Sequence, residues 1–175
     1  MEHLLSVDLL ALLLAAVSCA SDLRTRRIPN SIVLVGSAVG LITNALIAGP
    51  TGVGSSLAGG AVGLALFLPF FVLGGMGGGD VKLMAALGSL LGPGSILRLA
   101  VAAAVVGGCC ALIVAAWNGR LGEMLRNTAR LLAFWARSGL VPSPEQNLEA
   151  AGALKIPYAV PILVGTLFVA LGGWR

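Results

Sequence analysis

The sequence predicts an all-α protein, a polytopic integral membrane bundle of helices. Of its 175 residues, 58% are hydrophobic and only 10% are charged, whereas a soluble domain carries about 25% charged residues. The mean hydropathy is +1.00. Several apolar runs approach the roughly 20 residues that a helix needs to cross a hydrocarbon core about 30 Å thick. We expect residues 1–175 to form a single membrane-embedded domain without a soluble appendage.

Six apolar segments follow one another along the chain. Charged residues or Gly-Pro turns separate most of them. In order, they are Leu4–Ser21, Ser31–Ala48, Val53–Leu73, Val81–Leu91, Ile96–Trp117 and Pro157–Trp174. The fourth segment is too short to cross a bilayer alone, because a glycine run precedes it and Gly92-Pro93 ends it. The sequence therefore predicts about six transmembrane helices, one of them short.

Residues 118–150 form a less apolar stretch between the fifth and sixth segments. One side of a helix there would be mainly apolar, with Leu121, Met124, Leu125, Thr128, Leu131, Leu132 and Trp135. The other side would be mainly basic, with Arg120, Glu123, Arg126, Asn127, Arg130 and Arg137. Such a helix is typical of the membrane interface, but a cytosolic amphipathic helix packed on the bundle fits equally well. Val141–Ala150, with two prolines and two glutamates, is expected to be a loop.

The distribution of basic residues predicts the orientation in the membrane. With the amino terminus outside, nine Lys and Arg residues fall on the inner side, and only Arg98 and Arg175 fall outside. Cytoplasmic loops carry the excess of positive charge, so we expect a multi-pass protein with its amino terminus outside and the lipid bilayer as its surroundings. No dense basic face with interleaved aromatics indicates nucleic-acid binding. The three cysteines lack metal-ligand spacing and are expected to serve in packing.

Two aspartates are expected at nearly the same depth in the membrane. Asp80 precedes Pro93 by 13 residues, which is about 20 Å of helix and less than the thickness of the hydrocarbon core. Asp22 follows Asp8, which we place at the outer interface, by 14 residues, or about 21 Å of helix. Both carboxylates should thus lie within the membrane, toward its cytoplasmic side. The glycine run before Asp80 is expected to supply positive-φ turns and to let other backbones approach.

Each aspartate alone also has a structural explanation. Asp22 would pair with Arg26 four residues on, and Asp80 would cap the short helix. As a pair, however, two neighbouring carboxylates in a low dielectric share one proton, so that one acts as a base and the other as an acid toward a water molecule. This is the chemistry of peptide hydrolysis by an aspartyl dyad. A transporter that uses the aspartates as ion or proton sites and a scaffold without chemistry are the alternatives.

Two motifs resemble those of the prepilin peptidases, which are polytopic intramembrane aspartyl proteases of the G-x-G-D type. The first is DLRTRRIPN, and the second is GMGGGDVKLMAALG. In that family an aspartate is followed six residues later by Leu or Ile, then by Pro and by Asp or Asn, and the G-x-G-D motif is followed by Lys-Leu. The matching residues are Asp22, Ile28, Pro29, Asn30, Gly77, Gly79, Asp80, Lys82 and Leu83. A transporter leaves the Ile-Pro-Asn triplet unexplained.

The resemblance implies that Asp22 and Asp80 are the catalytic pair of an aspartic endopeptidase in the bacterial inner membrane. The remaining candidate residues would shape the site or meet the substrate; they are Pro29, Asn30, Gly77, Gly79 and Lys82. From its position alone, Lys82 is expected to be an anchor at the membrane surface.

The implied substrates are type IV pilin-like precursors, with a short basic leader ahead of a hydrophobic helix, cut after a glycine at the cytoplasmic face. The chain has no C-x-x-C pair, so it resembles the short, peptidase-only members of tight-adherence and Flp pilus systems. No methyl transfer, metal or cofactor is implied.

Overall fold

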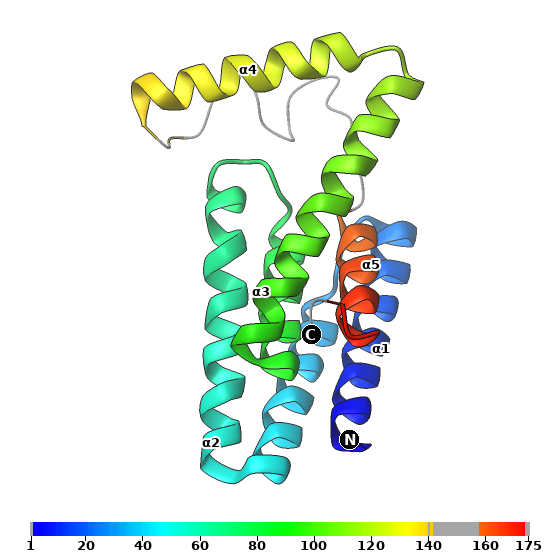
Figure 1. Cartoon of the computed structure of the whole chain (residues 1–175), viewed down its shortest axis with the longest axis vertical. Helices are drawn as coiled ribbons and strands as arrows, with labels where there is room; N and C mark the ends of the chain where they lie inside the picture. The colour runs from blue at the N-terminus through cyan, green and yellow to red at the C-terminus, as the bar shows by residue number, and fades with distance from the viewer. Residues whose placement is uncertain (1, 140, 142–157, 174–175) are drawn as a thin grey trace.

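The computed structural model describes residues 2–139, 141 and 158–173, with side chains from residue 7 onward. All elements in this part of the chain are α-helices (Figure 1), which confirms the all-α prediction for the described residues. They are α1 (Glu2–Thr25), α2 (Asn30–Val72), α3 (Gly78–Trp117), α4 (Leu121–Ser138) and α5 (Ala159–Ala170). The loop predicted for residues 141–150 lies, apart from Val141, outside the described residues, as do both ends of the predicted segment Pro157–Trp174.

Two of the helices, α2 and α3, each consist of two helical segments. The backbone of α2 leaves the helical conformation at Gly49 (φ 57°, ψ −137°), and that of α3 leaves it at Gly92 (φ 77°, ψ 173°). Only glycine adopts such dihedrals readily, and the proline that follows each glycine suits the first position of a new helix. The two halves of α2 run in opposite directions from the turn at Gly49 and diverge away from it (Figure 1). The breaks predicted at Gly49-Pro50 and Gly92-Pro93 are therefore confirmed.

By length and composition, α2 and α3 are the helices that could cross a membrane among the described residues, and α5 is a shorter apolar helix. Because α2 and α3 are each broken, their four segments correspond to the second to fifth predicted segments. The count of about six membrane crossings is not confirmed and stays a prediction.

Glycines determine how closely α2 and α3 pack. A Cβ atom at Gly59 would run into the carbonyl oxygen of Gly88, and one at Gly63 would run into that of Met84. A Cβ atom at Gly40 would lie 2.8 Å from the carbonyl carbon of Ser89. The two helices thus meet backbone to backbone. Small residues four apart allow this approach where lipid supplies no hydrophobic drive for association.

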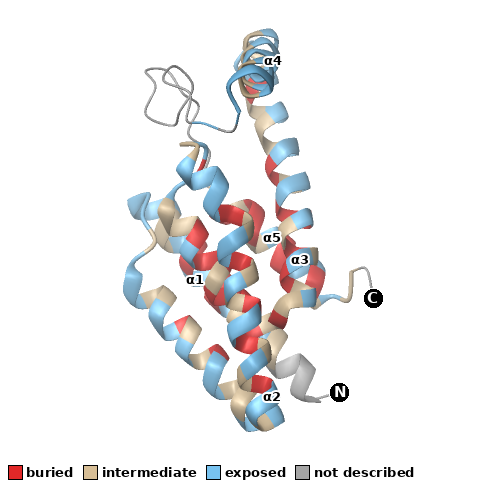
Figure 2. Ribbon diagram, turned by 90° about the vertical axis from the view of Figure 1, so that its left-hand side faces the viewer, coloured by how far each residue is buried: buried red, intermediate tan, exposed pale blue. Residues whose placement is uncertain are grey.

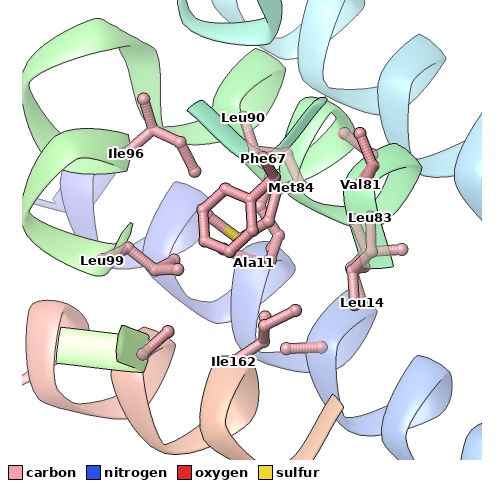
Figure 3. Packing of buried hydrophobic residues seen from close by; sticks show 14 of the residues in the cluster. Ala11, Leu14, Phe67, Val81, Leu83, Met84, Leu90, Ile96, Leu99 and Ile162 are labelled. Atoms are coloured by element: carbon pink, nitrogen blue, oxygen red, sulfur yellow. The ribbon is translucent and has the colours of Figure 1, made fainter. Parts of the chain in front are cut away.

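The core lies where α1, α2, α3 and α5 meet. In Figure 3 the ring of Phe67 lies beside Met84, with Ala11 of α1, Leu99 of α3 and Ile162 of α5 around them. Each of these five side chains is at least nine-tenths buried. Figure 2 shows the buried residues concentrated in the bundle and missing from α4. The core therefore ties α1 and α5, the first and last helices, to the α2–α3 pair.

Helix α4 lies across one end of the bundle instead of along it (Figure 1). None of its residues is buried, and among the described elements it contacts only α3, where the two helices join. Trp117, the last residue of α3, is 88% exposed. Of the two interpretations of this amphipathic helix, packing along the bundle is not observed, and the placement favours a helix at a surface. Its contact with a membrane stays a prediction.

Candidate active site

The first motif forms the end of α1 and the turn after it. Arg26 has a positive φ of 52° and ends the helix, and its N–H donates to the carbonyl oxygen of Asp22 at 2.7 Å. The hydroxyls of Ser21 and Thr25 both donate to the carbonyl oxygen of Arg27, at 3.0 and 3.1 Å. These short polar side chains bond to the backbone beyond the helix. The turn therefore starts within one helical turn of Asp22 and fixes the direction in which the chain leaves it.

The second motif places Asp80 in the first turn of α3. Gly77 is the N-cap residue, and its N–H donates to the Asp80 carboxylate. The Oδ2 atom of Asp80 lies only 3.2 Å from the position that a Cβ atom of Gly77 would take. This is the reach-back contact of an acidic residue at the third helical position, and the helix dipole favours a negative charge there. The capping interpretation of Asp80 is thus right in part. A carboxylate can accept about four hydrogen bonds, so capping the helix leaves Asp80 with positions that can bind a water molecule or a proton.

The glycines before Asp80 act mainly through their lack of a side chain. Within the run, only Gly74 has a positive φ, of 77°. The expectation that the run as a whole supplies positive-φ turns is therefore wrong, because Gly77 and Gly79 have ordinary dihedrals. A Cβ atom at Gly79 would lie 3.2 Å from the Cβ atom of Ile28, and one at Gly78 would lie 3.2 Å from a ring carbon of Phe71. The expected close approach of other segments is confirmed.

The two motifs meet at two points. Ile28 of the first motif packs on Gly79 of the second. Lys82 Nζ donates to Asn30 Oδ1 at 3.1 Å, while Pro29, in an extended conformation, is the N-cap residue of α2. Sequence reasoning treated Lys82 as a surface anchor and missed its partner. The only sequence signal for this contact was that Asn30 belongs to the first motif and Lys82 to the second.

Asp22 and Asp80 lie close enough for their charges to interact. The charge of Asp22 acts on Asp80, and Arg26 in turn acts on Asp22. Both aspartates are partly buried. The Arg26 interaction agrees with the expected pairing, but it does not keep Asp22 away from Asp80. Carboxylates from the ends of two different helices thus lie within electrostatic range of each other.

Helix α5 contributes to the site in a way that the sequence did not reveal. The backbone N–H of Ala159 donates to the Asp22 carboxylate. Tyr158 lies close enough to Asp80 for the charge of that carboxylate to act on its phenol group. The Tyr158 ring packs against that of Phe67, with centroids 6.3 Å apart. No motif marks these residues, which lie far along the chain from both aspartates. Only the fold joins them.

A buried hydroxyl lies one helical turn before Asp22. Ser18 is on the same face of α1, its side chain is fully buried, and its Oγ atom has no hydrogen-bond partner among the described residues. Burying an unpaired hydroxyl costs about 1–3 kcal/mol. Sequence reasoning did not single out Ser18, because an isolated serine in an apolar run carries no signal.

Comparison with known proteins supplies the family. No curated protein and no solved structure matches the chain. A family model described as the type IV leader peptidase family matches residues 9–112, which is more than half of the 175 residues. The matched range contains Asp22, Asn30, Asp80 and Lys82, and it ends within α3. The chain therefore belongs to the type IV leader peptidase family.

Proposed function

We propose that this protein is a membrane-embedded aspartic endopeptidase that removes the leader of type IV pilin-like precursors at the cytoplasmic face of the inner membrane. Membership of the family indicates a peptidase with pilin-like precursor substrates. The observation that carries the aspartic mechanism is the meeting of Asp22 and Asp80, from the end of α1 and the start of α3, with the charge of one acting on the other.

In the proposed mechanism the two carboxylates share one proton and act as a unit. The ionised carboxylate takes a proton from water as the water oxygen adds to the scissile carbonyl carbon. The protonated carboxylate gives its proton to the carbonyl oxygen. When the tetrahedral intermediate collapses, the C–N bond breaks, the leaving nitrogen takes a proton from one carboxyl group, and a hydroxyl of the intermediate returns a proton to the other. The products are a carboxyl group and a new amino terminus, and the pair again shares one proton. Gly77 and Ala159, through their backbone N–H groups, hold the two side chains in place.

The membrane location rests on two observations. Two helices, α2 and α3, are long and apolar enough to cross a membrane, and the family suggests an inner-membrane protein. The multi-pass topology with an outer amino terminus follows from the charge distribution and is part of the proposal. Nothing in the fold or the comparisons favours the alternative of a transporter, whereas the family match favours a peptidase.

Cleavage by aspartate variants tests the proposal. Purified Asp22→Asn and Asp80→Asn proteins in lipid vesicles are incubated with a panel of pilin-like precursors, and the new amino termini are sequenced. Each variant should lose cleavage while still inserting and keeping its thermal stability. Asp8→Asn, which removes another carboxylate of α1, serves as the control and should cut at the wild-type rate. Cleavage by either Asn variant at the wild-type rate would exclude the aspartyl mechanism.

A further inference from the structure

An apolar groove of about 380 Å³ runs between α1 and the first half of α2. One face of α1 lines it from Leu10 to Val17, and one face of α2 lines it from Ser31 to Val39, together with Leu90 of α3. At 1.5 Å per residue these stretches are about 10–12 Å long, or about two helical turns. Ser31 is the only polar residue of the lining.

The groove exists because α1 and α2 touch at few points. One contact is at Gly36, where a Cβ atom would lie 2.6 Å from the Cδ2 atom of Leu14. Helix α1 instead packs mainly on α5 and α3. Two lining residues, Leu13 and Val35, are 54% and 63% exposed. The groove is therefore open along the side of the bundle.

One end of the groove adjoins the candidate active site. Ser31 directly follows Asn30, whose side chain accepts the hydrogen bond from Lys82. On the other wall, Val17 precedes Asp22 by five residues, or about 7.5 Å along α1. Asp22 lies on a different face of α1 from Val17, so a chain leaving the groove at its Ser31 end would first pass Asn30 and then turn toward the carboxylates.

We propose that this groove binds the apolar helical segment of the substrate, the part of the precursor that follows the cleaved bond. The inference rests on the proposed function. A helix lying in a groove presents side chains at positions i, i+3, i+4 and i+7, which span about two turns and match the length of the lining. Helix α1 packs less closely on α2 than on α3 and α5, so among the interfaces of α1 a substrate helix finds the most room beside α2.

The competing occupant of the groove is a lipid acyl chain. A peptide that leaves its helix at the cut carries backbone N–H and C=O groups that must be satisfied inside a membrane. The Ser31 end, which is next in sequence to Asn30 and its hydrogen-bond partner Lys82, offers polar groups to such a backbone. An acyl chain has no groups that would use them. The polar end therefore favours a peptide.

Filling the groove separates the two occupants. Val35→Trp and Leu13→Trp proteins in vesicles are given two synthetic substrates with the same basic leader and cut site. One continues into a helix of about 20 apolar residues, and the other ends a few residues after the cut. We expect the kcat/KM of both variants on the long substrate to fall about tenfold or more, mainly through KM. Their kcat/KM on the short substrate should stay at the wild-type value.

The matched control is Val105→Trp, at a residue of α3 that is 59% exposed and does not line the groove. It should cut both substrates like the wild type. Wild-type kcat/KM of both groove variants on the long substrate would overturn the inference and leave the peptidase proposal standing. An equal loss on both substrates would also overturn it, because the active site itself would then be disturbed. A wild-type protein that cuts neither substrate would refute the proposed function.

Cross-linking gives an independent test. A cysteine at Val35, in a chain with Asp80→Asn, Cys109→Ala and Cys110→Ala, is combined with a cysteine in the apolar helix of the long substrate. The substrate should cross-link to Val35→Cys and not to Val105→Cys. Cross-linking that is absent at both positions, or equal at both, would show that lipid fills the groove or that contact is random.

Discussion

The α2–α3 contact and the α1–α2 contact are built in opposite ways. Along α2 and α3, glycines such as Gly59 bring backbone against backbone. The amide of Asn44 also donates to two carbonyl oxygens of α3, those of Ser89 and Leu90, at 3.0 Å. Between α1 and α2, Gly36 instead faces a flexible side chain, that of Leu14. The α2–α3 contact is thus closely packed, whereas the loose α1–α2 contact leaves the apolar groove between the two helices.

This difference in packing indicates which contacts fix the positions of Asp22 and Asp80. Asp80 belongs to the tightly packed α3, while Asp22 belongs to α1, which hardly contacts α2. Asp22 is held instead by the turn after α1, by the packing of Ile28 on Gly79, and by the N–H of Ala159 in α5. The relative position of the carboxylates therefore depends on these local contacts and on the packing of α1 against α3 and α5, more than on the α1–α2 interface.

The largest expected effect comes from breaking the tight contact. In Gly59→Ala the new methyl group meets the Gly88 carbonyl oxygen, and neither backbone can move without separating the helices. We expect a loss of about 3 kcal/mol, the upper part of the range for overpacking. Thermal unfolding in detergent measures it. The control is Gly54→Ala, since nothing lies within 4 Å of its Cβ position. Equal melting temperatures for the two variants would contradict the importance of the backbone approach.

The hydrogen bond between Lys82 and Asn30 should matter next, because it ties the start of α2 to the start of α3 beside the site. A double-mutant cycle with Lys82→Met and Asn30→Ala should give a coupling energy of about 1 kcal/mol in unfolding. Each single change should also lower the cleavage rate. Asn30→Asp keeps an acceptor for Lys82 and should retain activity. Strict additivity of the Lys82→Met and Asn30→Ala effects would show that this hydrogen bond does not contribute to stability.

A comparison within one helix tests the loose contact. Gly36 faces the side chain of Leu14, whereas Gly40 faces the backbone at Ser89 and Leu90. A side chain can rotate away but a packed backbone cannot, so Gly36→Ala should cost less than about 1 kcal/mol and Gly40→Ala clearly more. Both are measured by thermal unfolding under the same conditions. A larger loss for Gly36→Ala would mean that the α1–α2 contact is not loose.

The smallest effect is expected outside both contacts, in α4. Arg120 Nε lies 2.9 Å from Glu123 Oε2, and this hydrogen bond lowers the pKa of the Glu123 carboxyl. A lowered folded-state pKa means that the pair stabilises the fold above the ordinary carboxyl pKa and stops doing so as the pH falls through the lowered value. Because both side chains are exposed and screened by salt, Glu123→Gln should leave the melting temperature at about pH 7 unchanged. If the melting temperature of Glu123→Gln fell clearly at neutral pH but not in acid, the Arg120–Glu123 pair would contribute more to stability than we expect.

The sequence predicted those features that local residues determine. The breaks at Gly49 and Gly92 follow from glycine dihedrals and the prolines after them. The expectation that Asp22 and Asp80 lie at a similar depth rests on helix lengths measured against the membrane, and it stays a prediction. Tyr158 and Ala159 could not be foreseen, since they reach the site only through the packing of α5 on α1 and α3. The groove was equally invisible, because it arises from contacts that two helices do not make.

The N–H group of Ala159 at Asp22 has a consequence for biosynthesis. A ribosome makes both aspartates early, but the donor from α5 exists only after residue 159 has been added. A nascent chain that already contains the complete family-matched region, residues 9–112, still lacks it. The site is thus completed by a segment that is translated after the whole family-matched region, and its final assembly waits for that segment.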